Sequence, residues 1–226
     1  MRCSFGVCDG SGLVIDEATN TAYDCRCREQ LIARAKARNL TAVIPRRYRD
    51  VAFERPPVPE MDRDVVRAVR DFTDSVGEQL GAGRGLWFMG PVGTGKTTLA
   101  MLVSKAALEA GRSVAIYSLP RLLNVIRDIH RAERSHIDLL DRLTAVDLLH
   151  IDDVGAERTN EWVLEELYSI VNSRYEEQRS IVITTNIDDH DRLCEQIGAR
   201  TVSRLTEMCQ EMLLSGEDRR FEARFA

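Results

Sequence analysis

Apolar residues recur along this chain in two different periods. Short runs that are almost entirely apolar predict buried strands, and they lie at Leu86–Met89, Ser113–Tyr117, Val146–Ile151 and Ser180–Thr185. Between these runs, apolar positions recur every three or four residues, as on one face of an amphipathic helix. The alternation of strands and helices is an α/β pattern.

The helical spacing is clearest where Val65, Val69, Phe72, Val76 and Leu80 follow one another, and it predicts one amphipathic helix over Asp62–Leu80. Further helices are expected at Thr98–Leu108, Leu119–Ile129, Asn160–Glu177, His190–Ile197 and Ala199–Cys209. We expect a surface loop at Arg127–His136 and a final strand at Glu211–Ser215.

Gly90–Thr97 reads G-x-x-x-x-G-K-T, the pattern of a phosphate-binding P-loop, and it lies between a predicted strand and a predicted helix. Its glycines let backbone N–H groups surround phosphates, and the helix N-terminus adds partial positive charge. Lys96 would reach the β- and γ-phosphates of ATP, and the Thr97 hydroxyl would bind Mg²⁺. The predicted nucleotide-binding residues are Gly90, Pro91, Val92, Gly93, Thr94, Gly95, Lys96, Thr97 and Thr98. The alternative is a glycine-rich turn with a surface lysine.

Two consecutive acids follow the strand Val146–Ile151. Asp152 would hold Mg²⁺ through its water shell beside Thr97, and Asp153 would orient and polarise the attacking water. Asn186 follows the strand Ser180–Thr185, where its amide could bond the γ-phosphate and the water; the alternative is an Asn that starts the next turn. The second acid favours ATP hydrolysis over the chemistry of a P-loop kinase, which transfers phosphate to a small metabolite.

Arg200 and Arg204 are four residues apart, on one face of a predicted helix. Such a pair can reach a neighbouring subunit's γ-phosphate as an arginine finger. The competing interpretation is a local ion pair with Glu207 or Glu195.

Four of the six cysteines, Cys3, Cys8, Cys25 and Cys27, lie near the N-terminus in two pairs. Two short strands, Leu13–Ile15 and Thr21–Tyr23, would form a hairpin that brings the pairs together. Four thiolates suit tetrahedral Zn²⁺, which would supply much of the folding energy of so short a segment. Free thiols are the alternative.

At 226 residues with an apolar share of 44%, the chain suits one domain and a small appendage. No apolar run is long enough to span a membrane and no signal-peptide pattern is present, so we expect a cytoplasmic protein. The net charge is −5, so nucleic-acid contact would need a local patch. The basic stretch Arg26–Arg49, with a predicted helix at Glu29–Asn39, is one candidate; a solvated helix face is the other interpretation.

Prolines at Pro56–Pro59 indicate a stiff connector. They divide the chain into a zinc-binding and docking segment with its linker, residues 1–58, and an ATPase domain, residues 59–226.

Several motifs together resemble the DnaC/DnaI-type helicase-loader ATPases within AAA+. They are Gly90–Thr98, Leu149–Glu157, Ile183–Asn186 and Ser203–Cys209. The resemblance implies a three-layer α/β core with a parallel sheet of about five strands. It also implies that Asn186 is sensor 1, that Arg204 is the arginine finger completing a neighbour's site, and that Arg220 is the sensor 2 arginine. No helical lid follows the final strand, which puts Arg220 in doubt.

The function implied by this resemblance is an ATP-dependent loader. Such a protein assembles on single-stranded DNA and delivers a DnaB-type replicative helicase. The alternative is an IstB-like ATPase that assists a transposase on duplex DNA, because the Asp-Asp-x-Gly-Ala-Glu and Ser-Arg-Leu-x-Glu-Met runs are shared with that group.

Overall fold

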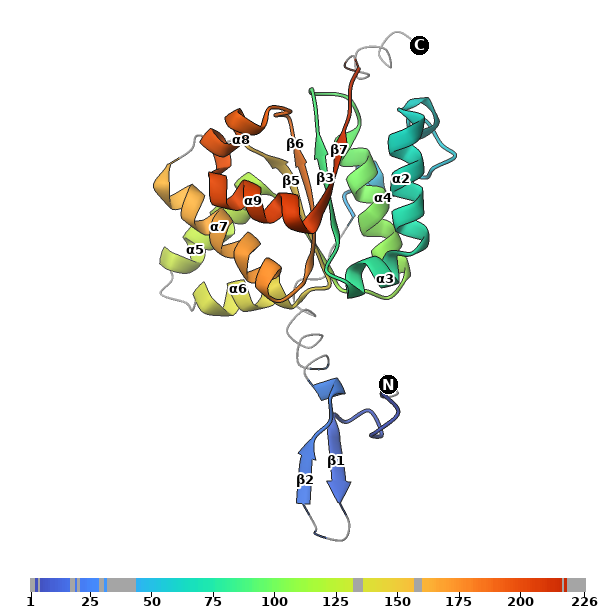
Figure 1. Ribbon diagram of the computed structural model, residues 1–226, viewed down its shortest axis with the longest axis vertical. Coiled ribbons are helices and arrows are strands. Elements are labelled where there is room, and N and C mark those ends of the chain that lie inside the picture. The colour runs from blue at the N-terminus through green and yellow to red at the C-terminus, as the bar shows by residue number, and fades with distance from the viewer. Residues whose placement is uncertain are drawn as a thin grey trace.

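The computed structural model describes residues 3, 5–16, 19, 21–28, 31, 44–131, 136–156, 160–216 and 218. Its main body is a parallel sheet between two layers of helices (Figure 1). The strands are β3 (Gly85–Met89), β4 (Val114–Ser118), β5 (Leu148–Val154), β6 (Ser180–Thr185) and β7 (Cys209–Leu213). They lie in the order β4-β5-β6-β3-β7, and each neighbouring pair is parallel. The predicted three-layer core with five parallel strands is confirmed.

Helices cover both faces of the sheet because its strands are apolar on both sides. In β3, Leu86 and Phe88 pack with the helices of one face, and Trp87 and Met89 with those of the other. The first layer comprises α2 (Arg63–Asp74), α3 (Val76–Gly81) and α4 (Lys96–Glu109). The second comprises α5 (Leu119–Arg131), α6 (His136–Ala145), α7 (Glu161–Glu176), α8 (His190–Ile197) and α9 (Ala199–Met208).

The helical assignments differ from the sequence predictions in two places. The single helix expected over Asp62–Leu80 is two helices, which meet at Ser75, whose hydroxyl donates to Asp71 O at 2.9 Å. Val76 and Leu80 are nevertheless buried, so the apolar period continues across the break. The loop expected at Arg127–His136 is wrong: α5 extends to Arg131 and α6 begins at His136, with residues 132–135 outside the described part. The density of charged residues between Arg127 and His136 is what suggested a loop.

The N-terminal segment is a hairpin of β1 (Leu13–Asp16) and β2 (Thr21–Asp24), drawn below the sheet in Figure 1. The strands pair antiparallel, with Leu13 opposite Asp24. This is the hairpin expected from the sequence. The predicted helix at Glu29–Asn39 lies outside the described residues, apart from Leu31.

Residues 44–61 pack against the sheet-bearing body. Two short 3₁₀ turns, η2 (Arg46–Tyr48) and η3 (Val58–Glu60), lead to α2. Val58 and Met61 are buried with α2 and α4, and Lys105 of α4 donates to the carbonyls of Arg49 and Val51. The proline-rich stretch is thus anchored to the core, and the boundary near residue 58 stays a prediction. Every helix in the described residues is too short or too polar to cross a bilayer.

Candidate functional site

Three predicted site segments meet at one edge of the sheet. The strands are parallel, so their C-terminal ends share an edge. Gly90 follows β3, Asp152 and Asp153 lie in the last part of β5, and Asn186 follows β6. β6 lies between β3 and β5, and the topology therefore places these segments beside one another.

The P-loop joins β3 to α4 in a conformation that needs glycine. Gly95 is the N-cap of α4 and has φ 99°, in the left-handed region that side chains disfavour. A Cβ on Gly90 would lie 2.0 Å from Leu214 O, because the segment after β7 passes directly beside it. The Lys96 ammonium is buried and donates to Gly90 O at 2.8 Å and Pro91 O at 2.6 Å. The lysine is thus held within the loop that precedes it.

Thr97 and Asp152 meet across the interface between α4 and β5. The Thr97 hydroxyl donates to Asp152 Oδ1 at 2.9 Å, and the Thr184 hydroxyl of β6 donates to the same oxygen at 2.7 Å. A hydroxyl and a carboxylate are the hard oxygen donors that Mg²⁺ prefers. Their contact fits the predicted metal pair, and it is the observation on which a Mg²⁺–nucleotide site depends.

Asp153 occupies an unusual backbone position beside Asn186. Its φ is 63°, and the β5–β6 register shifts between Ile151 and Val154. The Asp153 N–H donates to the Thr184 hydroxyl at 2.9 Å, and Asn186 Nδ2 donates to Asp153 Oδ1 at 2.7 Å. A left-handed non-glycine residue is uncommon and costs free energy unless its surroundings fix it. Because of this bulge, the carboxylates of Asp152 and Asp153 both lie at this edge of the sheet and do not alternate between its two faces.

Thr184 is a site residue that sequence reasoning missed. Its hydroxyl accepts from Asp153 and donates to Asp152, so one side chain orders both acids. It lies two residues before Asn186, in a strand predicted as buried. The available signal was a polar residue near the C-terminal end of a strand that was predicted to be buried.

A second polar pair lies deeper between α4 and β5. Ser104 Oγ and His150 Nδ1 are 2.9 Å apart, and both residues have no exposed surface. Burial lowers the pKa of His150 to about 4, although nearby Asp152 acts in the opposite direction. The imidazole is therefore neutral at physiological pH.

Two further segments lie against the P-loop. Asp218, after β7, is so close to Gly93 that a Cβ there would lie 1.9 Å from its Oδ1. Met61 lies equally near the loop, because a Cβ added to Gly95 would lie 2.2 Å from Met61 Cε. The predicted sensor 2 residue, Arg220, lies outside the described residues, so its place relative to the loop stays a prediction.

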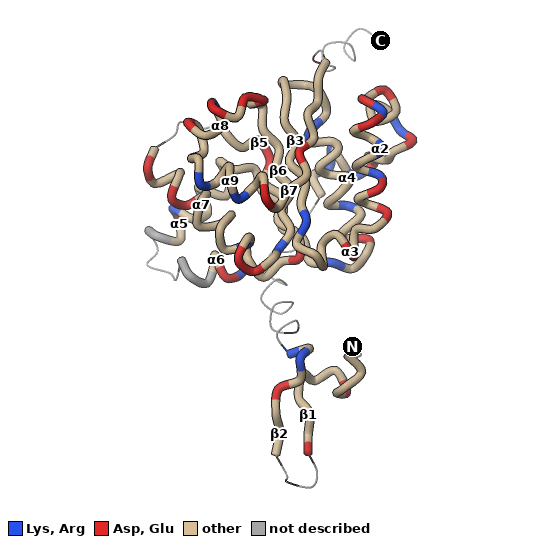
Figure 2. Tube along the Cα trace, in the orientation of Figure 1, with Lys and Arg blue, Asp and Glu red and all other residues tan. Residues whose placement is uncertain are grey.

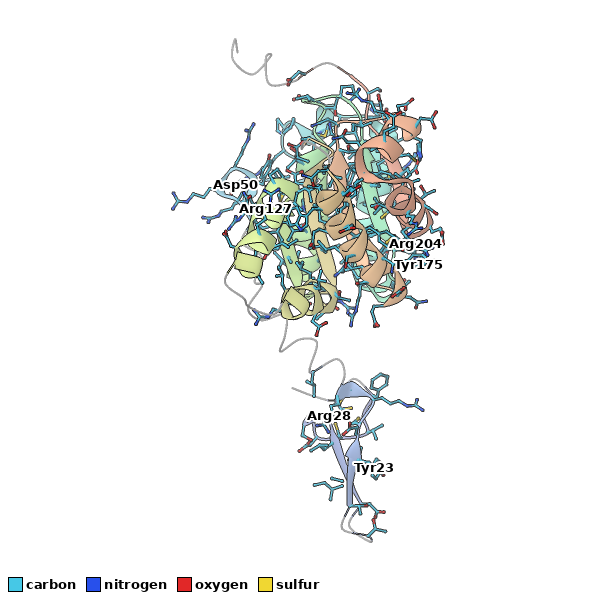
Figure 3. The ribbon with its side chains drawn as sticks, turned by 90° about the vertical axis from the view of Figure 1, so that its left-hand side faces the viewer. Tyr23, Arg28, Asp50, Arg127, Tyr175 and Arg204 are labelled. Atoms are coloured by element: carbon cyan, nitrogen blue, oxygen red, sulfur yellow. The ribbon has the colours of Figure 1, made fainter. Side chains whose placement is uncertain are left out.

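Arg204 packs within its own subunit, against α7 (Figure 3). Its guanidinium carbon lies 4.2 Å from the centre of the Tyr175 ring, and Nε donates to Asn172 Oδ1 at 3.3 Å. Nη1 lies 3.6 Å from Glu207 Oε1, the local ion pair weighed as the alternative. A third of the side chain remains exposed. These contacts leave open a role for Arg204 at a neighbour's site.

The four N-terminal cysteines converge on one point. Their sulfur atoms lie within 4.8 Å of one another, with Cys3–Cys25 at 3.7 Å and Cys8–Cys27 at 3.4 Å. Sulfurs on a tetrahedral zinc are about 3.8 Å apart for Zn–S bonds of about 2.3 Å. Hydrogen bonding from the Cys8 backbone amide lowers the pKa of Cys3 to about 6, whereas desolvation raises the pKa of Cys27. The cluster could bind a metal, and its donor set fits Zn²⁺.

Charge is distributed differently over the helices of the sheet-bearing body. Acidic and basic residues are interspersed along α2 (Figure 2), whereas the charged residues of α7 are mainly acidic. The described part of the predicted basic stretch includes Arg46, Arg47 and Arg49, all exposed around η2. Arg26 and Arg28, which follow β2, are also described, whereas Arg34, Lys36 and Arg38 lie outside the described part.

Comparison with known proteins gives consistent matches. A family model described as IstB-like ATP binding protein matches residues 81–224. The replicative helicase loader DnaC of Buchnera aphidicola is 24% identical over 185 residues, covering 78% of this chain and 74% of that protein. DnaI of Bacillus subtilis, also a replicative helicase loader, is 24% identical over 213 residues, covering 88% and 68%.

One solved structure, the crystal structure of the DnaC helicase loader, superposes with a TM-score of 0.67. It is 24% identical in sequence, and the match covers 76% of this chain and all of that one. At this identity the likeness establishes the fold.

Proposed function

This chain belongs to the family of IstB-like ATP binding proteins, and from that premise we propose that it is an ATPase that loads a replicative helicase. It would bind ATP at Gly90–Thr98 and hydrolyse it. The bound state would control assembly on single-stranded DNA and delivery of a DnaB-type helicase. The observation that carries the ATPase part is the 2.9 Å contact between Thr97 and Asp152.

The chain's own groups have distinct roles in this proposal. Lys96 would leave the carbonyls of Gly90 and Pro91 to neutralise the β- and γ-phosphates. Thr97 and Asp152 would hold Mg²⁺, which neutralises phosphate charge when bound. Asp153 would accept a hydrogen bond from the attacking water, with Asn186 fixing the carboxylate's orientation.

The helicase-loading part is supported by relatives that carry that function. DnaC of Buchnera aphidicola and DnaI of Bacillus subtilis are both helicase loaders, and each match extends over more than two thirds of this chain. The cysteine hairpin, within the proposed docking segment of residues 1–58, would be the contact for the helicase. Its Phe5, Val7 and Ile15 are exposed, as apolar residues at a docking surface would be.

A transposase-assisting role is the second candidate, because the matching family is described by IstB. The two functions differ in the nucleic acid bound and in the protein recruited. A loader acts on single-stranded DNA with a helicase, whereas an IstB-like helper assembles on duplex DNA.

Affinity capture of the host replicative helicase by the full chain, with ATP and with ADP, tests the proposal. Helicase retained with ATP and released with ADP is the expected result. With ATP, the Asp153→Asn variant should retain the helicase both before and after a long incubation, because this variant should not hydrolyse the ATP. Absence of helicase together with ATP-dependent assembly on duplex DNA would overturn the loader in favour of the transposase helper.

A further inference from the structure

Two polar contacts, at two depths, join α4 to β5. Near the sheet edge, Thr97 donates to Asp152; further inside, Ser104 meets His150. Ser104 lies seven residues after Thr97 on the helix, and His150 lies two residues before Asp152 on the strand. Both pairs therefore lie on the facing sides of the same two elements. The deeper pair has no role in the ATPase chemistry described above.

The position of His150 is otherwise apolar. Leu148, Val114 and Val182 surround this face of the sheet, and all three belong to one buried cluster with the apolar residues of α4. His150 Nε2 is buried and has no hydrogen-bond partner. A buried imidazole with one unsatisfied nitrogen costs free energy that leucine would not. The side chain is thus poorly explained by packing alone.

The unsatisfied nitrogen lies 4.0 Å from Asp152 Oδ1, the oxygen that Thr97 contacts. The Ser104 hydroxyl can donate to Nδ1, which places the ring proton on Nε2. The opposite tautomer would place a lone pair beside a carboxylate in a poorly screened interior. Electrostatics therefore favour the tautomer whose N–H is near Asp152, and in that tautomer the Ser104 hydroxyl donates to Nδ1.

We infer that His150, which is hydrogen-bonded to Ser104 on its other ring nitrogen, is a positioning residue that holds the Asp152 carboxylate in place for Mg²⁺. The inference rests on the proposed Mg²⁺–ATP site and adds a second layer to it. Hydrogen-bonded or electrostatic partners behind a metal ligand typically change metal affinity by about 10- to 100-fold when removed. Its contribution is the dipole of the N–H group beside Asp152, and the role requires no proton exchange with the nucleotide.

Direct metal binding tests this inference without relying on turnover. Free Mn²⁺, a paramagnetic substitute for Mg²⁺, is measured by electron paramagnetic resonance with the full chain and a non-hydrolysable ATP analogue. His150→Leu and Ser104→Ala should each weaken Mn²⁺ binding by about 10-fold or more. His150→Gln, which can again place an N–H near Asp152, should bind Mn²⁺ more tightly than His150→Leu. Analogue affinity without metal should be unchanged in all three.

Ser180→Ala is the matched control, because Ser180 is a fully buried serine in the neighbouring strand β6 and lies away from Asp152. It should bind Mn²⁺ as the unaltered chain does. Thermal melting of each variant checks the fold, because His150→Leu removes an unsatisfied nitrogen but also takes away the hydrogen-bond partner of the buried Ser104 hydroxyl.

Two results would overturn this inference. Unaltered Mn²⁺ affinity in His150→Leu, beside weakened affinity in Asp152→Asn, would overturn the role of His150 and leave the metal site standing. Unaltered affinity in both His150→Leu and Asp152→Asn would overturn the metal site itself, and this inference with it.

Discussion

Asn186 donates a hydrogen bond to Asp153 across two neighbouring strand ends, with Nδ2 and Oδ1 2.7 Å apart. The bond ties an exposed amide after β6 to the second acid of β5. Asp153 is also fixed by its backbone N–H, which donates to Thr184. Residues of the chain itself thus hold both the backbone and the carboxylate of Asp153.

Asp153→Asn should retain ATP binding and lose hydrolysis. Removing a positioned general base typically lowers a rate by about 10²- to 10⁴-fold, whereas Lys96, Thr97 and Asp152 remain to bind the nucleotide. Steady-state phosphate release and the affinity for a fluorescent ATP analogue measure the two effects separately. Asp188→Asn, at an exposed acid just after Asn186, is the control and should hydrolyse normally. Full turnover by Asp153→Asn would assign the base elsewhere.

Lys96→Ala should weaken ATP binding. The buried ammonium is the P-loop's one side-chain cation, and its removal should reduce ATP affinity by about 10-fold or more, or about 1.4 kcal/mol. Isothermal titration measures the effect. The matched control is Lys105→Ala on the same helix, whose ammonium instead contacts the Arg49 and Val51 carbonyls. If both variants bind ATP equally well, the P-loop is not the nucleotide site.

The sequence predicted those parts of the fold that follow from the spacing of apolar residues and from the positions of glycines. Apolar runs identified β3, β4, β5 and β6 because helices cover both faces of the sheet, and the positions of Gly90 and Lys96 follow from the P-loop pattern. The break at Ser75 escaped prediction because the apolar spacing of Val69 and Phe72 continues through Val76 and Leu80 on its other side. Amphipathic spacing therefore does not report that break.

Within the site, contacts between distant segments were the part that sequence could not provide. Asp218 reaches Gly93, and Ser104 reaches His150, only because β7 and β5 lie where the sheet places them. The separations are 125 and 46 positions along the chain. No local pattern encodes such a pairing, so only residues with a motif of their own were identified.

Arg204→Ala should leave the isolated subunit's ATPase unchanged and abolish its stimulation on assembly. Arginine fingers supplied by a neighbour raise phosphoryl-transfer rates by about 10³-fold or more, while in its own subunit Arg204 contacts Asn172, Tyr175 and Glu207. When unaltered chain is mixed with excess Asp153→Asn chain, the active sites of the unaltered chain should still be stimulated, because the Asp153→Asn chain still supplies Arg204. The double variant Asp153→Asn/Arg204→Ala should suppress them. Equal stimulation by both would show that Arg204 does not act in trans.

Metal removal should unfold the hairpin and spare the sheet-bearing body. Four converging thiolates would supply most of the folding free energy of β1 and β2, whose residues are largely exposed. Freshly purified chain should contain one zinc per subunit by elemental analysis. A strong chelator, or Cys27→Ser, should collapse the amide dispersion of residues 5–28 in NMR spectra, with the melting of the core unchanged. Cys194→Ser, outside the cluster, should have no such effect, and a folded hairpin without metal would refute the zinc site.

Arg174→Met should destabilise the whole core, because this fully buried arginine links three elements. Its guanidinium donates to the carbonyls of Leu143 and Thr144 in α6, to those of Val146 and Asp147 at the start of β5, and to that of Ser180 in β6. Methionine fills similar volume and leaves these carbonyls without their donor. Each buried carbonyl that loses its donor costs about 1–3 kcal/mol, and we expect a loss of about 3 kcal/mol or more in the free energy of unfolding.

Arg179→Met is the control: Arg179 is partly exposed and lies 3.6 Å from Asp147. That surface pair should contribute about 1 kcal/mol or less. Urea unfolding of both variants measures the difference, and equal losses would mean that the buried arginine holds no more of the fold than an ordinary surface pair.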